Sequence, residues 1–264
     1  MDLEKICFDV QKIARVTGRF IKEESKKLKK ESIEVKGANN FVTHVDKASE
    51  EMIVEGLQKV LPEAGFLVEE ETIDKIGEHY NWVIDPIDGT TNFIHGLPPH
   101  AISIGLLRDD KVILGVILEI VMEECFYAWE GSKAYLNGEE IHVTNNKKVK
   151  DCLIATGFPY TDFHRIEPFF KTMDYFMHNS HGLRRLGSAA TDMAYVACGR
   201  FDAFYEYGLN PWDIAAGIII IQQAGGMICD FQGGDNFFYG RELIASNSYI
   251  FKEFKNIVGS MMQV

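Results

Sequence analysis

Several features that define other classes of protein are scarce or missing in this sequence. Lysine and arginine together number 27 against 39 acidic residues, which gives a formal net charge of -12. Nonspecific attraction to nucleic acid or to an anionic membrane needs excess basic charge, so we expect neither partner. The longest apolar run covers residues 214–221, and the N-terminus is charged from its second residue. Neither a membrane-spanning helix nor a signal peptide is therefore expected.

Cysteine is also sparse. The five cysteines are widely spaced and contain no C-x-x-C pair, which excludes a disulfide scaffold and favours the reducing cytoplasm. The chain has no G-x-x-x-x-G-K-[ST] phosphate loop, no H-E-x-x-H zinc motif and no N-x-[ST] site. Its eight histidines show no ligand spacing, and we expect them at surface or packing positions.

The composition that remains is that of a globular protein. With 46% hydrophobic and 25% charged residues in 264, the chain can bury a substantial core. Apolar spacing predicts helices over residues 2–31, 46–61, 164–178, 188–198 and 212–224. Short apolar runs predict strands over residues 66–68, 82–84, 101–107, 111–120, 124–129, 152–155 and 202–207, with a hairpin turn at 108–110.

We expect two tightly joined units that act as one. Residues 1–145 form an N-terminal α+β layer, and residues 146–264 form a C-terminal α/β layer in which helices alternate with strands.

The densest group of chemically useful residues is W-V-I-D-P-I-D-G-T-T-N, residues 82–92. An apolar strand ends at Asp85, and Gly89 permits a backbone conformation that other residues resist. Asp85 and Asp88 can then point at one place, where two like charges are costly unless a proton or a cation neutralises them. Mg²⁺ suits such oxygen ligands. A surface type I turn explains the same letters equally well.

Three further features favour a phosphate and metal site. The backbone N–H groups of Gly89 and Thr90 can face an anion at the start of a short helix. Glu69, Glu70 and Glu71 follow an apolar strand, although a solvated acidic loop is the simpler interpretation for Glu71. Asp213 lies in the first turn of a helix that begins at Pro211, where a favourable interaction with the helix dipole would also account for it.

These residues together resemble the inositol monophosphatase family. D-P-I-D-G-T-T-N-F at 85–93 is similar to its first motif, and P-W-D-I-A-A-G at 211–217 with Q-Q-A-G-G at 222–226 to its second. V-T-H-V-D at 42–46, the acidic pair Glu69 and Glu70, and G-S-A-A at 187–190 occur in the same order. The resemblance covers the whole chain and implies a layered α-β-α-β-α sugar-phosphatase fold, an α+β architecture of mixed and antiparallel sheets with packed helices.

The resemblance also implies a metal centre with two or three Mg²⁺ per subunit. The family pattern assigns the first ion to Glu69, Asp85 and the backbone carbonyl of Ile87. It assigns the second ion to Asp85, Asp88 and Asp213, with Asp85 bridging both. Two cations about 4 Å apart can clamp the attacking and leaving oxygens of an in-line displacement.

The family pattern further implies how the reaction proceeds. Thr90, paired with Asp46, is the family's partner for the nucleophilic water, and Glu69 assists it. Phosphate rests on the N–H groups of Gly89 and Thr90, and Glu70 is an outer acid. The residues that meet substrate hydroxyls match Asp88, Ala189 and Glu206.

The implied activity is hydrolysis of a small polyol phosphate by direct attack of water, with inositol 1-phosphate as the expected substrate. T-G-F-P-Y at 156–160 departs from the serine of inositol-specific animal enzymes and is similar to the bacterial branch. Fructose 1,6-bisphosphate, adenosine 3',5'-bisphosphate and histidinol phosphate therefore stay open as substrates. Lys36 matches a family lysine near the metals, and an exposed lysine is an equal interpretation. We take Arg184 and Arg185 as a structural ion pair or an interface contact rather than as a phosphate clamp.

Other expectations come from the family or compete with it. The family implies lithium sensitivity and a homodimer, for which residues 112–118 offer either apolar surface or core. The basic run at residues 26–30 is the only support for a different class of function, a binding partner of cellular machinery, and a solvated helix face is the simpler interpretation. The D-x-D-G-T signature of the haloacid dehalogenases differs because two residues separate Asp85 from Asp88.

Overall fold

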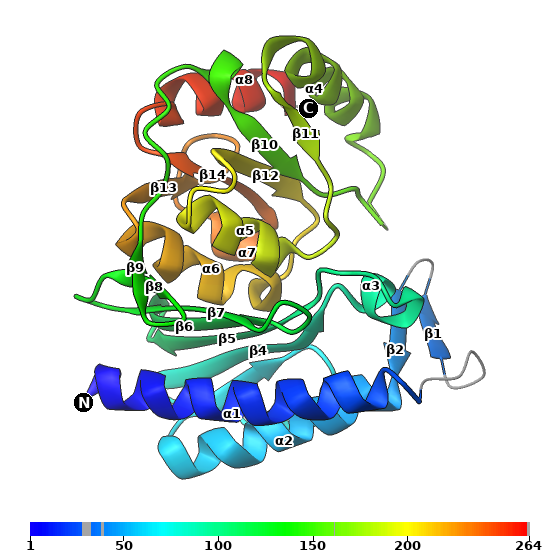
Figure 1. The fold of residues 1–264 in the computed structure, drawn as a ribbon, viewed down its shortest axis with the longest axis vertical. Coiled ribbons are helices and arrows are strands. Elements are labelled where there is room, and N and C mark those ends of the chain that lie inside the picture. Colours follow the sequence, from blue (N-terminus) through cyan, green and yellow to red (C-terminus); the bar gives the residue numbers. More distant parts are fainter. Residues whose placement is uncertain (28–32, 38–39, 161, 263–264) are drawn as a thin grey trace.

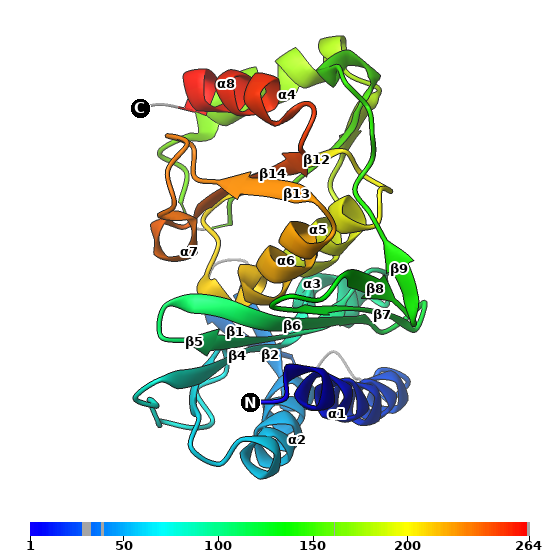
Figure 2. The ribbon, with the colours of Figure 1, turned by 90° about the vertical axis from the view of Figure 1, so that its left-hand side faces the viewer.

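The computed structural model describes residues 1–27, 33–37, 40–160 and 162–262, with backbone alone for 33–37 and 40–42. Five layers are stacked along the long axis, helices alternating with sheets (Figures 1 and 2). The outer pair α1 (Leu3–Glu24) and α2 (His44–Val60) is followed by a seven-stranded sheet, and the central pair is α5 (Ala189–Ala197) and α6 (Pro211–Gln223). A five-stranded sheet and the pair α4 (Ile166–Asn179) and α8 (Phe251–Met262) complete the stack. The α-β-α-β-α fold predicted from the sequence is confirmed.

The seven-stranded sheet has its strands in chain order. They are β3 (Gly65–Val68), β4 (Tyr80–Asp88), β5 (Ala101–Arg108), β6 (Lys111–Glu119), β7 (Glu124–Trp129), β8 (Ala134–Leu136) and β9 (Glu139–Ile141). Only β3 and β4 are parallel, and the remaining neighbours are antiparallel. Strands β5 and β6 are apolar along their length because α1 covers one face of the sheet and α6 the other.

Helix α6 packs unusually close to this sheet because the contact is made of small residues. A Cβ added to Gly115 would lie 2.4 Å from the carbonyl oxygen of Ala216, and one added to Gly105 would lie 2.8 Å from the Cβ of Ala215. Side chains at either glycine would push the helix away. The close packing fixes the position of the first turn of α6 relative to β4 and β5.

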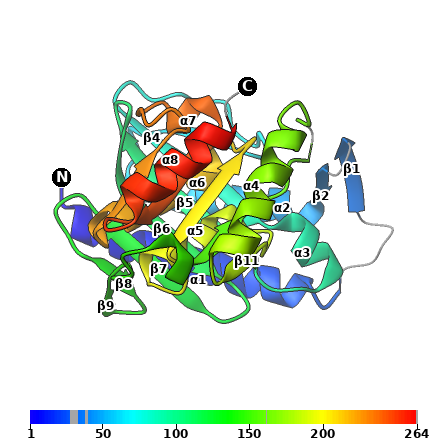
Figure 3. The same ribbon diagram turned by 90° about the horizontal axis from the view of Figure 1, so that it is seen from above.

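The second sheet is mixed. Its order is β11 (Gly182–Arg184), β10 (Leu153–Thr156), β12 (Ala203–Tyr207), β14 (Glu242–Asn247) and β13 (Gly226–Cys229). β10 is parallel to both of its neighbours, whereas β14 is antiparallel to both of its own. Seen from above, α4 and α8 cross the outer face of this sheet (Figure 3). The smaller elements are β1 (Ile33–Gly37), β2 (Asn40–Thr43), α3 (Thr90–His95), a 3₁₀ turn (Val149–Asp151) and α7 (Phe237–Gly240).

The elements predicted from the sequence need correction in three respects. The helix predicted over residues 2–31 ends at Glu24, and residues 28–32 lie outside the described residues. Strand β4 continues through Pro86 to Asp88 with an irregular register between Asp85 and Asp88. The prediction also missed short elements and elements that mix polar and apolar residues, namely β1, β2, β8, β9, β11, β13, β14, α7 and α8. The hairpin at 108–110 is confirmed, with Asp109 at a φ of 54°.

The apolar segment at residues 112–118 belongs to the core. Its large side chains are at most 6% exposed, so it contributes no surface to a dimer. Among the described helices, none has an apolar stretch long enough to cross a bilayer.

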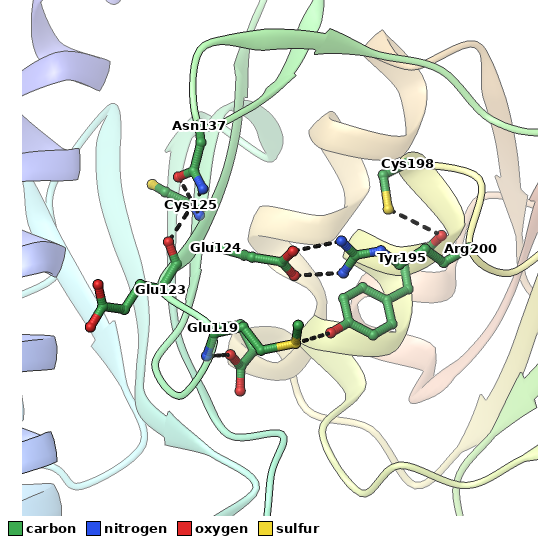
Figure 4. A network of polar contacts seen from close by, with 9 residues as sticks. Glu119, Glu123, Glu124, Cys125, Asn137, Tyr195, Cys198 and Arg200 are labelled. Atoms are coloured by element: carbon green, nitrogen blue, oxygen red, sulfur yellow. Dashed lines mark hydrogen bonds and ion pairs between the residues drawn. The ribbon is translucent and has the colours of Figure 1, made fainter.

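Polar contacts join β7 to the C-terminal half of the chain (Figure 4). Glu124, at the start of β7, accepts two hydrogen bonds of 2.5 Å from the guanidinium of Arg200. The same guanidinium lies 4.6 Å from the ring centroid of Tyr195 on α5. The layers therefore meet through a charged contact as well as through α6. The division at residues 145 and 146 stays a prediction.

Candidate active site

A cleft of about 380 Å³ opens where β4, α3, α5, β12 and α6 converge. It is lined by Glu69, Asp88, Gly89, Thr90, Ala189, Glu206 and Asp213, together with residues that the sequence analysis did not select. Residues from both halves of the chain thus face one cavity.

Three of the predicted metal ligands lie together, and two of them, Asp88 and Asp213, line this cleft. Asp85 and Asp88 stand on the irregular end of β4, and Asp213 is the third residue of α6. One carboxylate oxygen from each lies within 4.8 Å of the others. Asp85 is 2% exposed and Asp88 8%, which rules out the alternative of a surface turn. Among the described residues, no histidine or cysteine joins this group.

Asp88 is oriented by the start of α5. Its Oδ2 accepts a hydrogen bond of 2.7 Å from the hydroxyl of Ser188 and one of 2.6 Å from the N–H of Ala190. Asp88 therefore satisfies a donor at the N-terminus of a helix from the other half of the chain. The same contact fixes the rotation of the carboxylate in the cleft.

Asp85 and Asp213 are also oriented locally. Asp85 Oδ1 accepts from the N–H of Ile87 at 2.9 Å, and Asp213 Oδ2 accepts from the N–H of Asn210 at 2.7 Å. The second bond belongs to the N-terminal turn that Pro211 begins. The predicted helix start is confirmed. An interaction with the helix dipole alone does not account for Asp213, because its carboxylate also lies close to those of Asp85 and Asp88.

The proximity of these acids is unfavourable without a cation. Burial raises the pKa of Asp88 to about 6 and that of Asp213 to about 7. Burial, followed by the charge of Glu69, raises the pKa of Asp85 well above its ordinary value. Repulsion among buried carboxylates is relieved by a hard divalent cation with oxygen ligands. The donor set therefore fits Mg²⁺.

Gly89 and Thr90 line the cleft next to Asp88 in the sequence. Gly89 has a φ of 93°, and a Cβ there would lie 3.1 Å from the carbonyl oxygens of Gly187 and Pro99. Glycine is therefore required before α3, both for its conformation and for the close approach of backbone. The first turn of α3 leaves backbone N–H groups without helical partners, which suits an anion.

The Thr90 hydroxyl contacts Asp46 as the family pattern implies. Thr90 Oγ1 lies 3.4 Å from Asp46 Oδ1 and 3.0 Å from the carbonyl oxygen of Ile87. Asp46 is 1% exposed, and its Oδ2 accepts from the N–H and the hydroxyl of Thr43 at 2.8 and 2.6 Å. Burial raises the pKa of Asp46 to about 6. This carboxylate is thus held in place and is a capable proton acceptor near neutral pH.

Glu69 follows the last residue of β3 and continues the pairing, since its N–H donates to the carbonyl of Ile84 at 3.3 Å. Its side chain lines the cleft. Glu70 is 9% exposed, whereas Glu71 is exposed. The prediction that Glu71 lies in solvent is confirmed.

Ala189 and Glu206 also line the cleft. Gly157 packs directly on the Glu206 carboxylate, because a Cβ at this glycine would lie 2.0 Å from it. Burial raises the pKa of Glu206 well above its ordinary value. A carboxyl group in this position can exchange hydrogen bonds with a polyol.

The placement of Arg185 corrects the interpretation of the Arg184–Arg185 pair. Arg185 lines the cleft, and its guanidinium lies 5.2 Å from the ring centroid of Phe158 and 5.3 Å from that of Tyr160. It also donates a hydrogen bond to the Tyr160 hydroxyl. Arg184 is exposed and donates only to the carbonyl of Leu183 among the described residues.

The sequence analysis also missed Asp192 and Arg241, which line the cleft. Asp192 is 1% exposed, and its Oδ1 has no hydrogen-bond partner among the described residues. It lies three residues after Ala189 on α5, so helical periodicity from the G-S-A-A motif could have identified it.

Two predictions fall partly outside the described residues. Lys36 lies in β1, and its side chain is outside them. In the basic run, Lys29 and Lys30 are also outside, whereas Lys27 pairs with Glu24 at 2.8 Å.

Comparison with known proteins gives concordant findings. The model of the inositol monophosphatase family matches residues 2–259. The chain is 40% identical to "Nus factor SuhB" of Pseudomonas aeruginosa over 244 residues, 90% of each chain. It is 40% identical to "Fructose-1,6-bisphosphatase/inositol-1-monophosphatase" of Thermotoga maritima over 227 residues, 86% of each. The crystal structure of the extragenic suppressor protein suhB from Bartonella henselae matches with a TM-score of 0.89 and 35% identity, covering 98% of both chains.

Proposed function

Since the chain belongs to the inositol monophosphatase family and is a phosphoric monoester hydrolase, we propose that it is Mg²⁺-dependent and hydrolyses a small polyol phosphate, inositol 1-phosphate first among them. The observation that carries this proposal is the group formed by Asp85, Asp88 and Asp213, whose oxygens lie within 4.8 Å of one another. They stand beside the first turn of α3, where phosphate can bind.

Two or three Mg²⁺ per subunit would be held by the ligands that the family pattern names. Glu69, Asp85 and the Ile87 carbonyl would hold one ion, and Asp85, Asp88 and Asp213 another. When bound, Mg²⁺ supplies positive charge for the phosphoryl oxygens and lowers the pKa of a water molecule.

The chain's own residues then bind, orient and accept a proton. The N–H groups of Gly89 and Thr90 hold phosphate oxygens at the start of α3. Thr90 Oγ1 and Glu69 orient the attacking water, and Asp46 Oδ1 receives the proton through the Thr90 hydroxyl. The displacement is direct, with no phosphoenzyme.

The direct displacement is tested by stereochemistry at phosphorus. A single attack by water inverts the configuration of an isotopically chiral phosphate ester, whereas a covalent route through Asp85 involves two displacements and retains it. Retention, or label recovered on Asp85 after acid quenching, would reject the proposal.

Substrate selection is proposed to depend on Glu206 with Asp88 and Ala189. A buried acceptor discriminates against analogues that lack the hydroxyl it binds. The test is a panel of inositol 1-phosphate, fructose 1,6-bisphosphate, adenosine 3',5'-bisphosphate, histidinol phosphate and p-nitrophenyl phosphate with wild type and Glu206→Gln. We expect KM to rise for the polyol phosphates and to stay unchanged for p-nitrophenyl phosphate, which has no hydroxyl. Equal effects on all substrates would show that Glu206 selects nothing.

Arg185 favours one alternative, a bisphosphate substrate. Arg185 lines the cleft, and a second phosphate would pair with its guanidinium. The Thermotoga maritima relative carries fructose-1,6-bisphosphatase in its name. A fall in kcat/KM for Arg185→Gln that is confined to bisphosphates would support this alternative.

Two further properties rest on the family and are proposed with it. Millimolar Li⁺ should inhibit turnover, and unchanged rates would count against it. The chain should be a homodimer, which a sedimentation mass near the monomer's 29.9 kDa at micromolar concentration would reject. The relative named as a Nus factor motivates a second alternative, a binding role with incidental activity, which gains most if no panel member is hydrolysed with Mg²⁺.

A further inference from the structure

We propose that Glu50 is a positioning residue that clamps the turn at residues 69–72 and thereby holds Glu69 in place to bind metal. This inference rests on the proposed metal centre. Glu50 lies on α2, four residues after Asp46, so one face of this helix supports both the partner of Thr90 and the turn that carries Glu69.

The clamp consists of three hydrogen bonds to one carboxylate. Glu50 Oε2 accepts from the N–H of Glu70 at 2.8 Å, and Oε1 accepts from the N–H and the hydroxyl of Thr72 at 3.0 and 2.7 Å. All three donors come from the segment that directly follows Glu69. Glu50 is fully buried, so water does not replace these contacts when one is lost.

The turn needs such a clamp because its centre is in an unfavourable conformation. Glu71 has a φ of 56°, a left-handed conformation that side chains other than glycine rarely adopt. Its two neighbours, Glu70 and Thr72, are the residues bonded to Glu50. The carboxylate therefore holds both sides of the strained residue, and without it the turn would relax toward conformations with negative φ.

The turn begins where strand β3 ends. Glu69 is bonded through its backbone to Ile84 on β4, and the chain leaves the sheet at Glu70. Glu69 directly precedes the clamped residues, so relaxation of the turn would change the direction of its carboxylate, whereas Asp85, Asp88 and Asp213 stand outside the turn and accept hydrogen bonds that do not involve it. Loss of the clamp should therefore weaken metal binding without dismantling the carboxylate group.

The test is a Mg²⁺ titration by calorimetry, without substrate, of wild type and Glu50→Gln. In glutamine an N–H₂ group replaces one of the two carboxylate oxygens. That group cannot accept a hydrogen bond from the N–H of Glu70 or Thr72, so the clamp is lost on that side. Residues that orient metal ligands typically change metal affinity by about 10- to 100-fold when mutated, and we expect the Kd for Mg²⁺ to rise in this range. Hydrogen exchange of the Glu70 and Thr72 amides should accelerate in parallel.

The matched control is Glu119→Gln. Glu119 is another fully buried glutamate, and its Oε2 accepts a hydrogen bond from the backbone N–H of Met122 at 2.6 Å. A glutamine oxygen can replace that acceptor, so the Kd for Mg²⁺ should change by less than about twofold. An equal loss of affinity in both variants would overturn the proposal, because it would then reflect general softening of the core.

A second pair of variants separates the clamp from the charge of Glu50. In the Glu50→Gln background, Glu71→Gly allows the left-handed conformation without strain, whereas Glu71→Gln removes the same charge and keeps the strain. We expect the glycine, and not the glutamine, to recover at least about threefold of the lost affinity. No recovery with glycine would overturn the clamp and leave charge as the cause.

The remaining outcomes are also decisive. A Kd for Glu50→Gln within about twofold of wild type rejects the clamp. If that variant does not fold, Thr72→Val removes one bond and keeps the shape, and an unchanged Kd there rejects it as well. A wild type that binds no Mg²⁺ at millimolar concentration rejects the proposed metal centre instead.

Discussion

Replacing Asp88 by asparagine should inactivate the enzyme and at the same time stabilise the metal-free protein. The pKa of Asp88 is raised from 3.8 to about 6, chiefly by burial. The folded state therefore binds more protons than the unfolded state between these two pH values, and stability falls as pH rises through them. Above pH 6 the ionised group costs the fold about 3 kcal/mol, and asparagine removes this cost.

The local geometry allows the substitution. An asparagine oxygen can accept the same two hydrogen bonds from Ser188 and Ala190, so α5 keeps its N-terminal contact. Melting in EDTA should show Tm higher than wild type by about 6 to 12 °C at pH 8 and nearly equal at pH 4. Asp88→Ala is the control, since it removes the acceptor as well as the charge and should gain less.

Magnesium should reverse the order. A ligand that binds only the folded state adds about 4.1 kcal/mol at a thousandfold excess over Kd, which exceeds the cost of about 3 kcal/mol from ionised Asp88, and the wild type alone should gain it. Turnover of Asp88→Asn should be absent throughout. A Tm difference that does not depend on pH would refute the electrostatic reasoning, and activity that survives both the substitution and chelation would refute the metal assignment.

Three other substitutions test separate parts of the structure. Thr90→Ala should lower kcat by about 10² to 10⁴ with little change in KM, because it removes a positioned proton-transfer partner, and Thr90→Ser should retain most of the rate in a steady-state assay. Gly89→Ala should lose about 1–2 kcal/mol in urea denaturation and lose phosphate affinity, since its φ of 93° is unfavourable with a side chain; wild-type stability would contradict the backbone argument. Arg200→Ala should lower the free energy of unfolding by about 1–2 kcal/mol, because it removes a bidentate bond to Glu124 and the contact with Tyr195. The control is Lys12→Ala, which removes an exposed ion pair to Asp9. An equal loss in both variants would show that the Arg200 contact is weak.

The sequence by itself determined the chemistry of the site and the class of fold. Asp85, Pro86 and Asp88 lie in one short segment, so their proximity follows from local chain geometry. Gly89 before a helix start and Pro211 before Asp213 are local signals of the same kind. Apolar periodicity identified most long elements for the same reason, since each buries a face whose spacing is written along the chain.

The ends of the helices and strands, and the existence of the short strands, depend on tertiary contacts that the local sequence pattern does not reveal. The first helix ends at Glu24 although its apolar spacing continues, and the strand that carries Asp85 runs on to Asp88 because β5 pairs with it. From the sequence alone, the apolar residues 112–118 could form either a dimer surface or part of the core. Helix α6, from a hundred residues later, covers them and decides the matter.

Only the tertiary structure brought Asp213 to Asp85 and Asp88, because this proximity depends on the close approach of α6 to Gly105 and Gly115. The same is true of Arg185, which enters the cleft from the loop before α5 without any motif of its own. Glu50 is the extreme case. Nothing near it in sequence marks it, and its place becomes evident once the turn that follows Glu69 folds back onto α2 and directs three donors at one buried carboxylate.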